Sequence, residues 1–194
     1  DKDRYWDPVM SAANELGMVV SMHVGSSSQI PMISPDAPFM ANLTWGATRT
    51  SGAMLAWIFS GMFQRYPNLK IALSEGEIGW IPYFLERAEQ VLDKQRHWVM
   101  KGQRLLDHAG QGDVDLDALD VRATFRDHVF GCFIEDRHGI ASLDEIGVDN
   151  VMCETDYPHS DSTWPDCIGT VQRLIEHLDP EVQVKLLRGN AERL

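Results

Sequence analysis

Four short apolar segments of the sequence each end in side chains that can bind a metal ion or move a proton. The first ends at His23, the second leads to Glu75, the third to the Glu-Asp-Arg run at 135–137, and the fourth to Asp156 and His159. Imidazole nitrogens and carboxylate oxygens are both good ligands for zinc and manganese. A histidine gathered with two or three of these carboxylates would form a site for a divalent metal.

Bringing these side chains together requires the four segments to be neighbouring parallel strands. The segments are rich in β-branched and other apolar residues, are bounded by turn residues, and cover residues 18–24, 70–74, 129–134 and 150–154. In parallel α/β folds the carboxyl ends of the strands lie at one edge of the sheet and face the ligand. The pattern therefore predicts four strands that present their polar ends at one mouth.

Each of these residues also has a purely structural interpretation. His23, between two apolar neighbours on a strand, is compatible with a hydrogen-bonded structural role. Asp156 suits a helix cap or an Asx-turn in a proline-containing loop, and Glu75 and Glu77 suit solvated loop charges. The run at 135–137 suits an ion network on the surface. Only the shared position at strand ends favours a functional role for His23 and Glu75.

The remaining histidines and the aromatic residues near strand ends carry a weaker signal. Four histidines lack partners at ligand spacing and are expected in solvated or capping roles: His97, His108, His128 and His177. Three aromatic residues are candidates for the wall of a pocket, but aromatic side chains in such helices are usually part of the core: Trp80, Tyr83 and Trp164. We expect both groups to be structural.

Helical patterns separate the predicted strands. A first helix covers 7–17, with Asp7 as cap, Pro8 in the first turn and Gly17 as the stop. A long loop with three prolines follows the first strand. Later helices are expected at 54–63, 80–100, a short stretch ending at 146, 168–178 and 181–187, and an acidic surface excursion is expected at 108–120.

The alternation of strands and helices predicts an α/β protein with a parallel sheet and right-handed crossovers. A closed eight-stranded barrel usually takes about 250 residues. Four units in 194 residues therefore correspond either to a small open sheet or to half of a barrel. A half barrel would leave two unpaired strand edges, which proteins normally pair or cover.

The composition of the chain argues against some classes of partner and favours one cellular compartment. With 44% apolar residues the chain can bury a core, and its net charge of −12 argues against a nucleic acid partner. No apolar run approaches the roughly 18 to 20 residues that cross a membrane, and no signal peptide is visible. Three cysteines without paired spacing suit reduced thiols and a cytoplasmic location. The first residue is not Met, so we expect a piece of a longer protein.

Several motifs resemble the amidohydrolase-related family of the amidohydrolase superfamily. They are Met-His-Val-Gly at 22–25, Pro-Asn-Leu-Lys-Ile-Ala-Leu-Ser-Glu-Gly at 67–76, Asp-Asn-Val at 149–151, Glu-Thr-Asp-Tyr-Pro-His at 154–159, and Gly-Asn-Ala at 189–191. The family includes aminocarboxymuconate semialdehyde decarboxylase and γ-resorcylate decarboxylase. The resemblance implies a metal-dependent (β/α)8 TIM barrel, of which residues 1–194 form a single partial domain with strands five to eight. By the same resemblance, we expect the N-terminal half of the barrel to be absent from these 194 residues.

The resemblance also implies roles for individual residues. His23 matches the strand-five metal-binding histidine, and Asp156 matches the strand-eight aspartate that reaches the metal or the water beside it. Where these decarboxylases commonly have an acid–base histidine after strand six, this chain has Glu75. His159 is expected just outside the metal ligands, in support of them. The strand-one ligands have no counterpart in the chain.

The function implied by the resemblance is that of a lyase: a non-oxidative decarboxylase of a small aromatic or unsaturated carboxylic acid, dependent on zinc or manganese. Glu75 or Asp156 would supply the proton that replaces carbon dioxide. A metal-dependent hydrolase of an ester, amide or lactone, with Asp156 as base, is the alternative. A second alternative is a catalytically inactive barrel fragment. We expect no membrane partner and no activity from this fragment alone. The sequence is compatible with a homo-oligomer.

Overall fold

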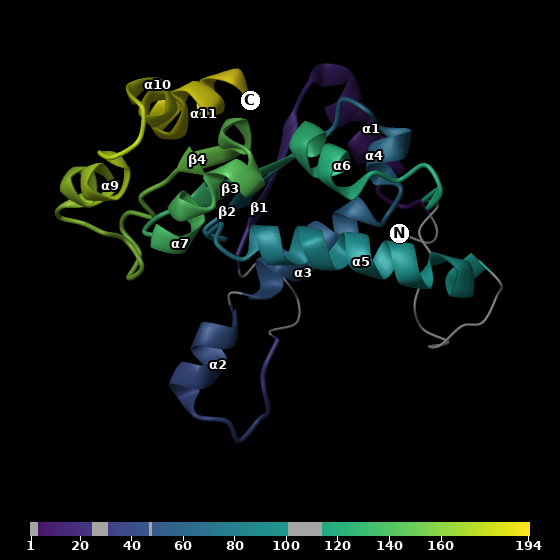
Figure 1. Ribbon diagram of the computed structural model, residues 1–194, viewed down its shortest axis with the longest axis horizontal. Coiled ribbons are helices and arrows are strands. Elements are labelled where there is room, and N and C mark those ends of the chain that lie inside the picture. Colours follow the sequence, from purple (N-terminus) through teal and green to yellow (C-terminus); the bar gives the residue numbers. More distant parts are fainter. Residues whose placement is uncertain (1–3, 25–30, 47, 101–113) are drawn as a thin grey trace.

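The computed structural model describes residues 4–24, 31–46, 48–100 and 114–194, with only the backbone of 98–100 (Figure 1). The strands are β1 (Val19–His23), β2 (Lys70–Ser74), β3 (Val129–Phe133) and β4 (Val151–Cys153). The helices are α1 (Asp7–Leu16), α2 (Phe39–Gly46), α3 (Thr48–Ile58), α4 (Met62–Arg65), α5 (Ile81–Met100), α6 (Val121–His128), α7 (Arg137–Ala141), α8 (Leu143–Ile146), α9 (Cys167–Ile175), α10 (Pro180–Val184) and α11 (Asn190–Arg193). A 3₁₀ turn, η1 (Val148–Asn150), precedes β4, and a π-helical turn, η2 (Lys185–Gly189), joins α10 to α11.

The four strands form one parallel sheet in the order β1-β2-β3-β4. Helices connect each strand to the next, so the predicted α/β class with a parallel sheet is confirmed. The register places His23 opposite Ser74, which puts the ends of β1 and β2 side by side. All four carboxyl ends therefore lie at the same edge of the sheet, as the strand pattern predicted.

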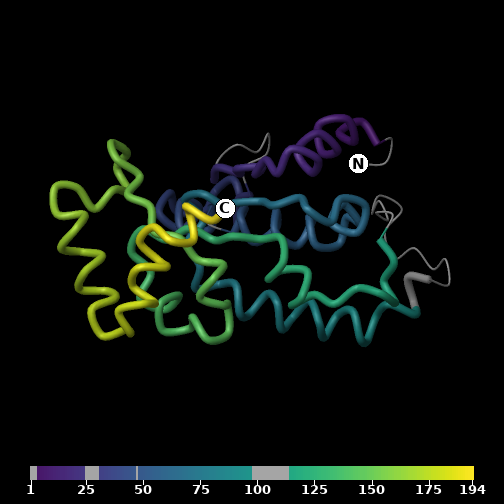
Figure 2. Tube along the Cα trace, turned by 90° about the horizontal axis from the view of Figure 1, so that it is seen from above, coloured from purple at the N-terminus to yellow at the C-terminus, as the bar shows by residue number. Residues whose placement is uncertain are grey.

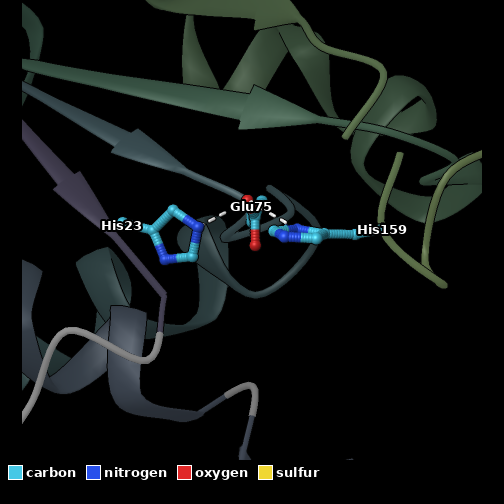
Figure 3. Close-up of side chains that lie close together, drawn as sticks. All are labelled: His23, Glu75 and His159. Carbon is cyan, nitrogen blue, oxygen red and sulfur yellow. Dashed lines mark ion pairs between the residues drawn. The ribbon is translucent and has the colours of Figure 1, made fainter. Parts of the chain in front are cut away.

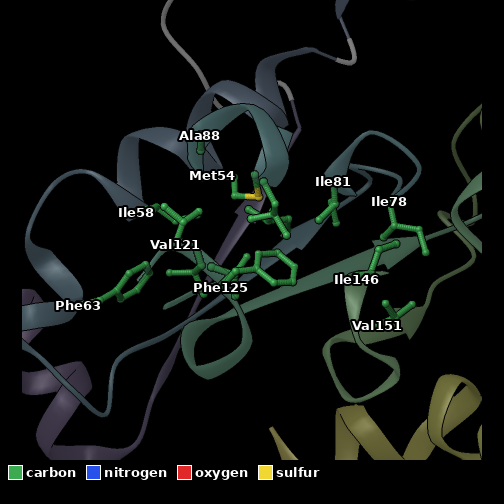
Figure 4. Packing of buried hydrophobic residues seen from close by; sticks show 14 of the residues in the cluster. Met54, Ile58, Phe63, Ile78, Ile81, Ala88, Val121, Phe125, Ile146 and Val151 are labelled. Atoms are coloured by element: carbon green, nitrogen blue, oxygen red, sulfur yellow. The ribbon is translucent and has the colours of Figure 1, made fainter. Parts of the chain in front are cut away.

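The main core lies between one face of the sheet and the helices α3, α5 and α6 (Figure 4). Met54, Ile58, Ile81 and Phe125 are each at most 1% exposed. Fully burying a large apolar side chain contributes about 1.5–3 kcal/mol relative to leaving it exposed. This cluster therefore fixes the helices against the sheet and holds the strand ends in place.

The opposite face of the sheet carries a smaller apolar cluster of Ala72, Phe130, Cys132 and Met152. Leu194 packs against it, and Figure 2 marks this end of the chain (C, yellow) near the middle of the trace. Burial raises the pKa of the Cys132 thiol to about 12, so this cysteine acts as a small apolar side chain. All three cysteines are free, as their spacing predicted.

Several predicted elements differ from the observed ones. The proline-containing loop includes α2, and α6 was not predicted at all. The helix predicted at 54–63 divides into α3 and α4, because Gly61 takes a left-handed conformation with φ of 76°. Asp7 lies inside α1 rather than capping it, and its carboxylate pairs with Arg65 at 3.4 Å. Part of the excursion predicted at 108–120 lies outside the described residues.

Two buried asparagines explain part of the sequence motifs. Asn190, from the Gly-Asn-Ala motif, is 1% exposed and donates through Nδ2 to the carbonyls of Val148 and Val151. Asn150 donates in the same way to the carbonyls of Arg126 and Val129. Each amide bonds to the carbonyl of the first strand residue and to a carbonyl in the helix or turn before it, so these residues secure the starts of β3 and β4.

His128 is a buried core residue, which contradicts the solvated or capping role predicted for it. Its ring stacks on Phe63 with centroids 4.3 Å apart, and its Nδ1 donates to the Leu69 carbonyl at 2.7 Å. Burial lowers its pKa below 6.5, and the bond to Leu69 opposes this shift. His97 and His177 are exposed as predicted, and His108 lies outside the described residues.

No helix within the described ranges is both long and apolar enough to span a membrane.

Replacing His128 with Asn keeps a neutral donor for Leu69 and removes the titrating group. The unfolded parent chain binds a proton near pH 6.5, whereas the buried imidazole resists it, so the unfolding free energy should fall as pH drops below 6.5. His128→Asn should lose this part of the decline. Urea denaturation between about pH 8 and about pH 5 measures it. The exposed control His97→Asn should behave like the parent, and equal pH slopes for His128→Asn and the parent would contradict the prediction.

Candidate functional site

The site lies where three strands end. His23 is the last residue of β1, Glu75 follows β2 directly, and Asp156 and His159 lie in the loop after β4. Figure 3 shows His23 and His159 approaching the Glu75 carboxylate from opposite sides. The structure therefore brings together residues from three of the four strand ends that the sequence placed at the mouth. From the run at 135–137, Asp136 instead accepts hydrogen bonds from backbone N–H groups.

The donor atoms of His23, Glu75 and His159 all lie within 4.8 Å of one another, as a metal site requires. His23 Nε2 is 2.7 Å from Glu75 Oε1, and His159 Nδ1 is 3.8 Å from the same oxygen. The two imidazole rings are nearly perpendicular, with centroids 6.4 Å apart. Two imidazoles and a carboxylate form a donor set that suits zinc or manganese.

Each imidazole is held through its Nδ1. His23 Nδ1 lies 2.8 Å from the Val24 carbonyl, which can only accept, so this nitrogen carries the proton. His159 Nδ1 lies 2.7 Å from Asp156 Oδ1. Metal-binding histidines are commonly oriented in this way, by a carbonyl or a carboxylate on the nitrogen that does not bind. His23 Nε2 is therefore available as a ligand, whereas the His159 nitrogen that lies near Glu75 is the same Nδ1 that contacts Asp156.

Asp156 lies behind His159, and its side chain is only 5% exposed. The backbone N–H of His159 also donates to the Asp156 carbonyl at 2.8 Å, which closes a tight turn. The sequence predicted His159 as a supporting residue, but nothing in the sequence indicated how near its ring lies to Glu75. The three-residue spacing between Asp156 and His159 indicates only the contact between these two, because such spacing brings two side chains together in a turn.

Negative charge is concentrated around the cluster. The pKa of Glu75 is raised by burial and by the adjacent Asp156 carboxyl, against the opposing effect of His23 and His159. Burial and neighbouring carboxylates also raise the pKa of Glu154 to about 7. Crowded carboxyl groups favour a proton or a cation between them. The site is therefore electrostatically suited to a divalent cation.

Three acidic residues at the mouth adopt a left-handed backbone conformation. Glu75, Glu77 and Asp156 have φ of 54°, 51° and 51°. This region costs a residue with a Cβ about 1–2 kcal/mol. Such residues persist where the surroundings determine their conformation, and here the Glu154 carboxylate accepts a hydrogen bond from the Glu75 N–H. The conformation turns Glu75 and Asp156 toward the cluster.

Two further carboxylates hold the loops after β2 and β3 to each other. Asp136 accepts from the N–H groups of Ile78 at 2.8 Å, Gly79 at 2.5 Å and Gly139 at 2.7 Å. In the opposite direction, Glu77 lies within 3.4 Å of the N–H groups at positions 134 and 135. We call this pair of contacts the carboxylate clasp. Glu77 and Asp136 are therefore structural, and neither is the solvated or surface charge that the sequence suggested.

Aromatic residues near the mouth are less buried than predicted. Trp80 packs against the core and donates through Nε1 to the Gly76 carbonyl at 2.7 Å, as a core residue should. Tyr83 and Trp164 were also expected in the core, yet each is 64% exposed. The Trp164 ring lies 6.0 Å from that of Tyr157. The prediction fails for Tyr83 because it lies on the exposed side of α5, opposite the buried Ile81, Leu85 and Ala88, and for Trp164 because it lies in an exposed loop.

Comparison with known proteins identifies the family and the fold of the chain. The Amidohydrolase family matches residues 1–194, whereas no protein of curated function matches the chain. A 5-carboxyvanillate decarboxylase from Sphingomonas paucimobilis is 24% identical with a TM-score of 0.73, over 99% of this chain and 53% of that one. The enzyme of the same name from Novosphingobium aromaticivorans, solved with manganese and 4-hydroxy-3-methoxy-5-nitrobenzoic acid, is 20% identical with a TM-score of 0.73, over 99% and 51%.

Other chemistry occurs on the same fold. The 4-oxalomesaconate hydratase of Rhodopseudomonas palustris is 20% identical with a TM-score of 0.56, over 99% of this chain and 50% of that one. The chain thus spans about half the length of the solved structures it resembles. At these identities the likeness establishes the fold, half of an amidohydrolase TIM barrel, and leaves the reaction to be argued from the site.

Replacing Asp136 with Ala should destabilise the protein by about 2–4 kcal/mol, because three backbone N–H groups lose a charged acceptor. Urea denaturation measures the loss. Asp144→Ala is the matched control, since this exposed carboxylate lies in the first turn of α8 and should contribute less than about 1 kcal/mol. Equal unfolding free energies for Asp136→Ala and Asp144→Ala would show that the carboxylate clasp does not stabilise the mouth.

Proposed function

The chain belongs to the Amidohydrolase family, and from this membership we propose that it carries the metal-binding mouth of an enzyme that removes carbon dioxide from a small aromatic or unsaturated carboxylic acid. The similar structures include the 5-carboxyvanillate decarboxylases of two organisms, and that from Novosphingobium aromaticivorans was solved with manganese and a nitrobenzoic acid. These names support the proposal without deciding it, because the fold hosts several reactions.

The observation that carries the proposal is the convergence of His23, Glu75 and His159. The 2.7 Å contact between His23 Nε2 and Glu75 Oε1 needs a proton between the two atoms, since both otherwise only accept. A cation can take the place of that proton. The set of two imidazoles and one carboxylate therefore fits a divalent zinc or manganese ion.

A bound cation would polarise the carboxylate and a neighbouring oxygen of the substrate. In this proposal His23, Glu75 and His159 hold it, and Asp156 orients His159 through Nδ1. This differs from the role that the family resemblance implies for Asp156, which is direct contact with the metal. Asp156 as a direct ligand, with His159 supporting it, is the alternative arrangement of the same pair.

The proton that replaces carbon dioxide must come from a group beside the donors. Glu75 and Asp156 are adjacent carboxyl groups, and the pKa of Glu75 is raised by burial and by Asp156. When Glu75 holds the cation, Asp156 is the neighbouring carboxyl that remains for proton transfer. We therefore propose Asp156 as the general acid.

A hydrolase would use the same residues differently. Asp156 would then act as a base toward water, and the substrate would be an ester, amide or lactone. One of the similar structures is a hydratase, which supports a reaction with water as the alternative. An inactive barrel piece would bind no metal, so metal content separates this last possibility from both enzymes.

Metal binding should depend on each proposed donor. In the full-length protein, loaded with manganese or zinc and then dialysed, elemental analysis should find near-stoichiometric metal. His23→Ala, Glu75→Gln and His159→Ala should each lower the affinity strongly, whereas the exposed control His97→Ala should not. Asp156→Asn should weaken binding by about 10- to 100-fold if Asp156 only orients His159. A parent protein without metal, or variants that bind as well as the parent, would refute the site.

The reaction should be a decarboxylation. With a panel of hydroxybenzoic acids, the metal-loaded full-length protein should release carbon dioxide and the corresponding phenol. Asp156→Asn should lower kcat by about 10²- to 10⁴-fold, the usual contribution of a positioned acid. Turnover of esters or lactones in place of carbon dioxide release would assign the protein to the hydrolases.

A further inference from the structure

A pocket of about 350 Å³ lies between α7 and α9. Pockets that hold small molecules measure about 300–1,000 Å³, so this one is large enough for a small metabolite. The described residues that line it are separate from His23, Glu75 and His159. In Figure 1 the two helices lie next to each other, and α9 is at the end of the molecule opposite to α1. The pocket is therefore a candidate for a second binding site.

One face of each helix forms a wall of the pocket. Residues three and four positions apart lie on the same side of a helix. The α7 wall consists of Arg137, Ile140 and Ala141, and the α9 wall of Thr170, Arg173, Leu174 and, just after the helix, His177. Ile140 is 4% exposed and belongs to the main core, and Leu174 packs against that core. The apolar floor of the pocket is thus fixed to the body of the protein.

The residues on either side of Asp136 bring opposite charges to the pocket. The Glu135 carboxylate and the Arg137 guanidinium both line it, and both side chains are exposed. Within the described part of the chain, neither side chain forms a hydrogen bond or an ion pair. They therefore do not pair with each other, which would require an approach to about 4 Å. The pocket offers one free cation and one free anion.

The backbone that carries these two charges is fixed by the carboxylate clasp. Asp136 accepts from the N–H groups of Ile78 and Gly139, and the Glu135 N–H donates to Glu77 at 3.3 Å. The two charged side chains therefore leave the chain at fixed points. Because these points are set before a ligand arrives, the ligand does not have to meet the entropic cost of ordering this backbone.

The opposite wall adds a guanidinium whose charge is already matched. Both terminal nitrogens of Arg173 lie 3.1 Å from Asp166 Oδ2, and one of them donates to Thr170 Oγ1 at 3.0 Å. The free charges that remain are those of Arg137 and Glu135. A simple anion would be repelled by Glu135, and a simple cation by Arg137. A ligand with one charge of each sign avoids both repulsions.

We propose that the pocket binds a free α-amino acid with a large apolar side chain. The carboxylate of the ligand pairs with Arg137, whose guanidinium can donate two parallel hydrogen bonds to it. The ammonium group pairs with Glu135, and the apolar side chain packs on Ile140 and Leu174. Such a zwitterion has no net charge, so the net charge of −12 on the chain does not repel it. This binding requires neither the metal nor the proposed reaction.

Saturation-transfer NMR on the full-length protein, dialysed free of metal, tests the class of ligand. L-phenylalanine should bind with a dissociation constant on the order of 1 mM or lower, as expected for a ligand of about 12 heavy atoms. 3-Phenylpropionate lacks the ammonium group and 2-phenylethylamine lacks the carboxylate. Each should bind at least about tenfold more weakly, because one charge of the pocket is left unmatched. L-alanine, which lacks the ring, should also bind at least about tenfold more weakly.

Two variants assign the charges. Arg137→Gln should weaken the binding of L-phenylalanine about tenfold, whereas Arg126→Gln, the same change at an exposed position of α6, should bind like the parent. Glu135→Gln should also weaken the binding of L-phenylalanine about tenfold. The same variant should bind 3-phenylpropionate as well as the parent or better, because the carboxylate that repels this ligand is gone.

The variant His23→Ala separates this pocket from the mouth and should bind L-phenylalanine like the parent. Loss of binding in His23→Ala would place the amino acid at the mouth and would overturn the proposal. So would the absence of binding up to about 10 mM, equal affinity for the four ligands, or an Arg137→Gln variant that binds like the parent. Since the protein is free of metal and no turnover is measured, failure here is distinguishable from failure of the proposed function.

Discussion

The mouth of this half barrel depends on carboxylates that accept hydrogen bonds from backbone N–H groups at the ends of parallel strands. Where a strand ends and the chain turns into a helix, its N–H groups lose their partners in the sheet and need other acceptors. Asp136 satisfies those of the loop after β2, Glu77 satisfies those that follow β3, and Glu154 satisfies that of Glu75. These contacts hold the loops in the conformation that presents the donors.

The use of carboxylates as acceptors for backbone N–H groups also gives the site its negative charge. Carboxylates used as structural acceptors lie beside carboxyl groups that are free for chemistry, so negative charge accumulates in a partly buried place. Burial and this charge raise the pKa of both Glu75 and Glu154. A group of acids that would destabilise one another when all are ionised gains stability from a proton or a cation. The carboxylates at this edge of the sheet therefore both hold the loops in place and favour the binding of a cation.

Two surfaces of the protein have opposite character. The mouth is acidic and is built from strand ends that the main core holds in place. Residues 31–46, which include α2 and lie between β1 and α3, carry one charged residue, Asp36, and expose several large apolar side chains. Because this segment belongs to the connection that leaves β1 at the mouth, its sequence can vary without disturbing the sheet, as loops on α/β folds do.

The sequence by itself determined the strands, the α/β class and the position of His23, Glu75, Asp156 and His159 at strand ends, because these follow from local apolar patterns and turn residues. It did not determine which carboxylates are structural, since Glu77 and Asp136 look like solvated charges until their backbone partners are known. The burial of His128 against Phe63 and the approach of His159 to Glu75 were likewise decided by the tertiary structure. Such contacts join side chains whose relative positions depend on the whole packed sheet, and a local pattern of residues cannot specify them.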